Sequence, residues 1–174
     1  HFATLFIEEI GDFIQANVDE FFSFTKYAEQ IATSASSFNQ IDTFLTYQPT
    51  LIEDQMLVIL EARIKQHAPD LVGFTIPFPG NLFSALRCSQ FIKQFYPQIK
   101  IAFGGGYCNT ELRSLEDPRI FEYVDFISLD DGEGPLLKIV KYIEGKVEVN
   151  ELENSLLHTI EKYNLVINKN KRKQ

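Results

Sequence analysis

The sequence predicts an α/β fold in which parallel strands alternate with helices. Two apolar runs of strand length, Leu71–Ile76 and Ile99–Phe103, lie on either side of a segment with helical periodicity. The first run is almost uninterrupted, as expected of a strand buried on both faces. A third apolar run, Tyr123–Leu129, precedes another helical pattern. Strands joined through helices of this length pair in parallel, because each helix carries the chain back across the sheet.

Composition bounds the class of protein. The chain has 174 residues, enough for one domain or one domain with an appendage, and 45% hydrophobic residues with 16 Phe supply a core. A net charge of −8 argues against nucleic acid as a partner. No run reaches the roughly 18 apolar residues of a membrane span, and no secretory signal is visible. We therefore expect a cytoplasmic protein that binds neither membrane nor nucleic acid.

The N-terminal region, residues 1–49, is expected to be mostly helical and packed on the core. Residues 2–33 are rich in aromatic side chains, and Phe2–Ile7 within them is short enough to be either a strand or the start of a helix. Residues 33–40 form a polar connection. The expected helical stripe consists of Val18, Phe21, Phe22, Thr25, Ala28 and Ile31.

A clearer helix begins at Thr50. Thr50 and Glu53 have the spacing of a capping box directly after Pro49, and the helix is expected to end before Pro69. His67 falls in its last turn, where a surface or capping role is more common than ligand binding.

The segment after the first strand is predicted to be a helix. Asn81 is the expected N-cap, the helix covers Leu82–Tyr96, and Pro97 ends it. Cys88 falls on this helix as a packing residue. With Cys108 it makes neither a disulfide framework nor a metal motif.

Three glycines, Gly104, Gly105 and Gly106, follow the second strand directly. Glycine lets the backbone take positive φ and approach a ligand closely, and ligands of parallel sheets lie outside the carboxyl ends of the strands. The triplet is therefore either a contact surface for a flat or phosphate-bearing ligand or a tight turn. Cys108, just beyond, either faces a ligand or is a small buried residue, and the second is the commoner case.

Two short helices are expected between the second and third strands. Asn109 or Thr110 is the expected cap of the first, and Asp117-Pro118 begins the second. After the third strand, Pro135 opens a helix for which Gly145 is the natural C-cap.

Acidic residues cluster after the third strand. Asp130, Asp131 and Glu133 suggest a metal site, because hard cations take carboxylates. Acidic residues also favour helix N-termini, and no calcium-loop spacing follows, so we favour the helix-terminus interpretation. The expected central domain spans residues 50–149.

Residues 150–174 are expected to form a hairpin and a linker. The strands Leu157–Glu161 and Asn164–Asn168 flank a turn at Lys162-Tyr163, and a basic stretch, Lys169–Lys173, follows. A first residue that is not Met and a polar basic tail suggest a piece of a longer protein.

Together these motifs resemble the cobalamin (vitamin B12)-binding domain that precedes the catalytic domain in many radical S-adenosylmethionine enzymes. The matching pieces, in family order and spacing, are Asp70–Thr75, Ala102–Gly106, Tyr123–Asp125 and Gly132–Gly134. The resemblance covers roughly the central and C-terminal 100 residues.

The resemblance implies a flavodoxin-like or Rossmann-like doubly wound sheet that holds the corrin over its strand ends. Thr75 would lie beside the lower face of the corrin, with Pro77 in the first contact loop. Gly104, Gly105 and Gly106 would let the backbone approach the corrin edge or nucleotide tail. The loop after the third strand would contribute Gly132 and Glu133.

Several departures limit the inference. The family's usual first strand is not evident, the Asp-x-His-x-x-Gly signature of a lower axial ligand is absent, and Pro77 stands where the family often has Leu. The Cys-x-x-x-Cys-x-x-Cys run that holds the iron–sulfur cluster is missing as well. The iron–sulfur cluster and S-adenosylmethionine would therefore belong to a downstream radical domain of the same chain, and this piece of an Fe–S oxidoreductase would not be catalytic alone.

The leading hypothesis is an accessory module that positions cobalamin, with a peptide or small molecule as substrate of the parent enzyme, which would be methyltransferase-like. The alternative is a cofactor-free scaffold or docking domain of the same fold. A receiver-like regulator ranks last, because no acidic pair follows an early strand.

Overall fold

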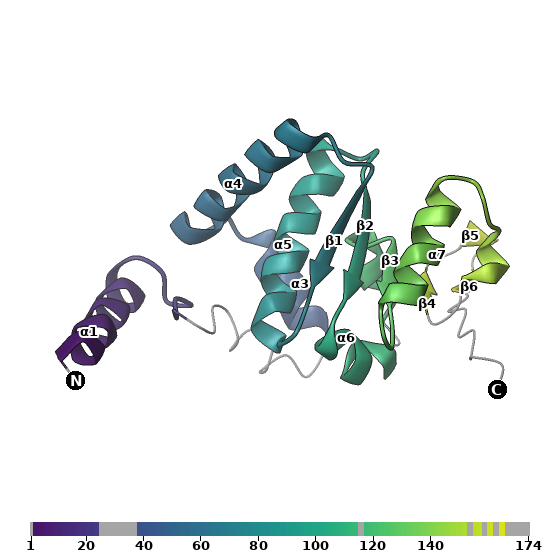
Figure 1. Ribbon diagram of the computed structural model, residues 1–174. Helices are drawn as coiled ribbons and strands as arrows, with labels where there is room; N and C mark the ends of the chain where they lie inside the picture. The colour runs from purple at the N-terminus through teal and green to yellow at the C-terminus, as the bar shows by residue number, and fades with distance from the viewer. Residues whose placement is uncertain are drawn as a thin grey trace. The chain divides into compact units, whose positions relative to one another are not determined.

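The computed structural model describes residues 2–24, 38–114, 117–152, 155–157, 160–161 and 164–165 (Figure 1). The chain divides into two compact units. The first contains residues 1–68 and 78–91, and the second contains residues 69–77 and 92–174. Within the described ranges, no helix is both long and apolar enough to cross a membrane.

The first unit is helical. It contains α1 (Phe2–Asn17), α3 (Phe38–Thr46), α4 (Leu51–His67) and most of α5 (Pro79–Phe95). The predicted capping box of α4 is confirmed, since Thr50 Oγ1 accepts from the Glu53 N–H and the Glu53 carboxylate accepts from the Thr50 N–H. Ala68, in the left-handed conformation, ends α4.

The second unit contains a four-stranded sheet in the order β1-β2-β3-β4. The three strands β1 (Leu71–Thr75), β2 (Lys100–Gly104) and β3 (Phe126–Ser128) are parallel. β4 (Ser155–Leu157) runs antiparallel to β3 at the edge. The predicted α/β class, with a parallel sheet flanked by helices, is confirmed.

One apolar core cluster of the second unit lies between this sheet and α7 (Glu133–Ile143). Figure 1 shows α7 beside β3. Ile139 of α7 packs with Ala102 of β2 and Phe126 of β3, and all three side chains are buried. β2 is buried on both faces, because Ile101 and Phe103 point away from Ala102 and are also buried. β3 is buried on both faces as well, since all three of its residues are buried.

Short helices connect β2 to β3 and α7 to β4. They are α6 (Gly106–Thr110), the 3₁₀ turns η1 (Leu112–Ser114) and η2 (Pro118–Glu122), and η3 (Val149–Glu151). The predicted start at Asp117-Pro118 is confirmed, since the Asp117 side chain caps η2. The predicted cap at Asn109 or Thr110 was wrong, because α6 begins at the glycines and contains both residues.

Two further sequence expectations are corrected. β1, the first strand of the sheet, is not buried on both faces, because Gly73 and Thr75 on one face are exposed. α5 begins at Pro79 rather than after Asn81. Proline is tolerated at the first helical position, because the N–H that it lacks would have no partner within the helix.

The aromatic N-terminal segment also differs from expectation. Phe2–Ile7 is helical. The predicted helical stripe begins at Val18, but α1 ends at Asn17 and residues 18–24 are not helical. The Asp19 side chain then accepts from the Phe21 N–H, an Asx turn that competes with helix. Thr25, Ala28 and Ile31 lie outside the described residues. The helix α3 lies in the N-terminal region that is expected to be mostly helical, but it begins at Phe38, inside the connection expected over residues 33–40.

At the C-terminal end, the described residues include two-residue strands β5 (Ile160–Glu161) and β6 (Asn164–Leu165), which pair antiparallel. Leu157 belongs to β4 instead of the predicted hairpin. Residues 158–159, 162–163 and 166–168 of that hairpin lie outside the described ones, so the hairpin stays a prediction, as do the domain boundaries at residues 49/50 and 149/150.

Candidate functional site

The carboxyl ends of the three parallel strands bring the predicted site residues together. Thr75, the last residue of β1, is in register with Gly104, the last residue of β2. The next peptide continues this pairing, because the Ile76 N–H donates to Gly104 O at 2.7 Å. Pro77 follows and lies near Gly106, where an added Cβ would be 3.6 Å from Pro77 O. The glycine triplet is thus adjacent to the end of β1.

Gly105 has a structural reason to be glycine. Its φ of +102° is a conformation that side chains rarely adopt, and an added Cβ would lie 2.9 Å from both Ile76 N and Ile76 O. The Ile76 carbonyl also accepts from the Tyr107 N–H at 3.0 Å, which fixes the start of α6. Close packing of the two strand ends therefore accounts for Gly105 without a ligand.

The loop after β3 joins the same edge of the sheet. Ser128, at the end of β3, lies 3.9 Å from the position of a Cβ on Gly104 and donates through Oγ to Gly132 O at 3.5 Å. Asn109 of α6 bonds both backbone groups of Asp130, accepting from its N–H at 2.6 Å and donating to its carbonyl at 3.1 Å. α6 and the β3–α7 loop are therefore tied together.

This edge presents an open surface. Thr75, Pro77, Gly106 and Glu133 are exposed, and Gly132 is half-buried. A Cβ added at Gly132 or Gly134 would meet no atom within 4 Å. Backbone at the edge is thus accessible to a flat ligand.

The acidic residues of the loop take structural positions. Arg113 forms an ion pair with Asp130, whose φ of +60° is unusual for a residue other than glycine. Glu133 lies in the first turn of α7, as the helix-terminus interpretation predicts. Within the ranges that the structure describes, no group of three or more His, Cys, Asp or Glu side chains is placed to hold a metal ion.

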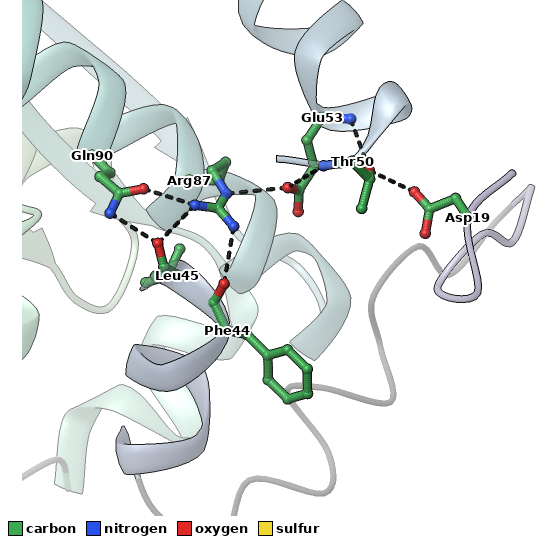
Figure 2. A network of polar contacts seen from close by, with 7 residues as sticks. All are labelled: Asp19, Phe44, Leu45, Thr50, Glu53, Arg87 and Gln90. Carbon is green, nitrogen blue, oxygen red and sulfur yellow. Dashed lines mark hydrogen bonds and ion pairs between the residues drawn. The ribbon is translucent and has the colours of Figure 1, made fainter. Parts of the chain in front are cut away.

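A second polar cluster, within the first unit, was missed by sequence reasoning (Figure 2). Arg87 of α5 is 4% exposed and lies 3.2 Å, Nε to Oε2, from Glu53, which is 3% exposed. Its other nitrogens donate to the carbonyls of Leu45 at 2.8 Å and Phe44 at 3.0 Å, at the end of α3. Gln90, one turn further along α5, accepts a hydrogen bond from the Arg87 guanidinium. One guanidinium thus joins α3, α4 and α5.

A second buried carboxylate extends this cluster. Thr50 Oγ1 donates to Asp19 Oδ2 at 2.7 Å, and Asp19 is 4% exposed. Burial, opposed by the Arg87 charge, raises the pKa of Glu53 above its ordinary value. The sequence signal for this cluster was limited to the capping box, because nothing in the spacing of Arg87 places it beside Glu53.

Both cysteines are buried and free. Burial, with the Glu53 charge as a smaller cause, raises the pKa of Cys88 to about 11, and burial raises that of Cys108 to about 12. Thiols with such pKa values are poor nucleophiles at neutral pH, so both cysteines are packing residues.

Comparisons with known proteins identify no relative. No family model, no curated protein and no solved structure matches this chain.

Proposed function

We propose that the second unit is a cobalamin-binding-like module that positions a corrin over the carboxyl ends of β1, β2 and β3. The observation that carries the proposal is the convergence of two glycine-containing loops, after β2 and after β3, with the end of β1 on one edge of a parallel sheet. Parallel sheets bind ligands at this edge, and backbone without side chains permits close approach.

The strand order supports a flavodoxin-like interpretation. In the flavodoxin-like order 2-1-3-4-5, the last three strands lie side by side in chain order. The order β1-β2-β3 observed here matches that half of the sheet.

In this proposal, the residues at the carboxyl ends of the strands contact the corrin as an open surface and supply no axial ligand. Gly132 and Gly134 leave room beside the loop, and Thr75 offers a hydroxyl at the end of β1. When bound, cobalamin would supply methyl-transfer or rearrangement chemistry together with a downstream radical domain. The residues of this chain would orient the ring and exclude water from one face.

A second candidate is a cofactor-free docking scaffold of the same fold. Two observations favour it. Gly105 is explained by packing against Ile76 alone. Among the described strands, the parallel order also contains no switch point, the place where doubly wound sheets form their ligand crevice.

Calorimetry with hydroxo-, methyl- and adenosylcobalamin separates the two candidates. The module should bind at least one of them with a Kd on the order of 10 µM or lower. Gly134→Leu places a side chain in open space at a helical position, so it should weaken binding at least about tenfold without unfolding the protein. The control is Gly73→Ala, also in open space but in the middle of β1. Absence of heat with all three cobalamins would favour the scaffold.

A further inference from the structure

A groove of about 590 Å³ lies in the second unit at the amino ends of β2 and β3. Lys100 and Phe126, the first residues of these strands, line it, whereas the glycine loops follow the last residues. The groove is therefore separate from the proposed corrin surface. Its volume is in the range of small-molecule sites, which is roughly 300–1,000 Å³.

One wall of the groove is aromatic. Phe126 and Tyr142 meet edge to face with ring centroids 6.0 Å apart, and Phe121 of η2 contributes a further ring. Phe126 is buried, whereas Phe121 and Tyr142 are half-buried and present part of their surface. Such a wall favours an apolar or aromatic group.

A positive charge lies on the β2 side. Lys93 Nζ donates to Asp125 Oδ2 at 2.6 Å, and the Ile101 N–H donates to the same oxygen at 2.8 Å. Lys100 Nζ is 3.5 Å from Asp125 Oδ1, a long ion pair, and its side chain is 48% exposed. Two ammonium groups therefore share one carboxylate, and Lys100 retains the capacity to bind a ligand carboxylate.

Negative potential lies at the end of α7. This helix ends in a turn at Gly145, whose φ is +70°, and the C-terminal end of a helix dipole favours cations. Glu148, exposed just beyond this turn, also lines the groove. A ligand ammonium group is suited to this side.

We propose that the groove binds a small apolar zwitterion of about dipeptide size. Its carboxylate pairs with Lys100, its ammonium pairs with Glu148, and its apolar body lies against Phe121, Phe126 and Tyr142. The chain has a net charge of −8, which disfavours simple anions but not a zwitterion without net charge, so each charge of the ligand should add to its affinity.

The test uses L-leucyl-L-phenylalanine as probe, with its N-acetyl and C-terminal amide derivatives, which each lack one charge. Two-dimensional ¹H–¹⁵N NMR titration of the whole chain should shift the amides of Lys100, Tyr142 and Val147, with a Kd on the order of 1 mM. Each derivative should bind about two- to fivefold more weakly, the usual effect of an exposed charge pair.

Variants assign each charge. Lys100→Gln should remove the preference for the dipeptide over its amide, and Glu148→Gln should remove the preference over the N-acetyl form. Lys146→Gln is the matched control, because Lys146 is exposed, pairs with Glu144 and does not line the groove. Equal binding of all three probes, or no shift at these amides, would overturn the proposal. Retained two-dimensional spectra of the variants show that they fold.

Discussion

At the residue scale, the glycine triplet contains positions with different physical reasons to be glycine. Gly105 combines positive φ with backbone atoms 2.9 Å from where a Cβ would stand, whereas Gly104 has Ser128 Cβ at 3.9 Å as its nearest neighbour. A motif read from the sequence treats the two glycines alike. In the structure, packing requires a glycine at Gly105, whereas at Gly104 it leaves room for a side-chain methyl group.

The two glycines therefore respond differently to alanine. Gly105→Ala should lower the free energy of unfolding by at least about 2 kcal/mol, because strained φ and overpacking add. Gly104→Ala should change it by about 0.5 kcal/mol or less, as expected of an added methyl in ordinary contact. Urea unfolding of both variants and the wild type measures the difference. Equal destabilisation would contradict the packing account of Gly105.

Glu53 links stability to pH. Its folded pKa is raised above the ordinary value of 4.5, mainly by burial, so the folded state favours the protonated carboxyl. Its contribution to stability is therefore fully present below pH 4.5 and is lost as pH rises through the raised pKa. Glu53→Gln removes this titration.

Urea unfolding between about pH 4 and pH 7 tests this linkage. The unfolding free energy of the wild type minus that of Glu53→Gln should fall as pH rises through the interval. A difference that stays constant or rises with pH would show that Arg87, rather than burial, dominates the Glu53 environment.

At the element scale, α5 is held within the first unit by charge as well as by apolar packing. Leu82, Phe83 and Leu86 are buried apolar residues of this helix. Arg87 adds bonds to the last turn of α3 and to the first turn of α4. Because a buried guanidinium without its partners is costly, this cluster restricts how the three helices pack.

Arg87→Met tests this restriction. It leaves the Glu53 carboxylate buried without its cation and removes a donor from each of two carbonyls, so it should destabilise the protein by about 3–5 kcal/mol. Arg87→Met with Glu53→Met removes both charges and should recover part of that loss. Thermal unfolding of the two variants provides the comparison. A double variant less stable than the single one would contradict an ionic origin.

At the scale of the whole molecule, the structural features that can be predicted from the sequence are those that local patterns determine. The three parallel strands follow from apolar runs bounded by glycine and proline, and the α4 capping box follows from Thr50 and Glu53. The edge position of β1 and the strand β4 depend on pairing across long sequence separations, which short windows do not contain. The buried Arg87–Glu53 pair was missed for the same reason, since the two residues are 34 positions apart.

The same distinction applies to the candidate site. The glycine loops were identified from the sequence, and their convergence on one edge follows from parallel pairing. The packing reason for Gly105 and the bonds between Asn109 and Asp130 required coordinates, because they join separate loops.

The proposed role of the edge formed by these loops is to hold a corrin. The most direct measurement is the ultraviolet–visible spectrum of the protein after incubation with hydroxocobalamin and desalting. A protein that holds a corrin at this edge should retain a corrin band that is shifted from that of free hydroxocobalamin, and the intensity of this band should fall in Gly134→Leu. A colourless protein would contradict corrin binding at this edge and favour the cofactor-free scaffold.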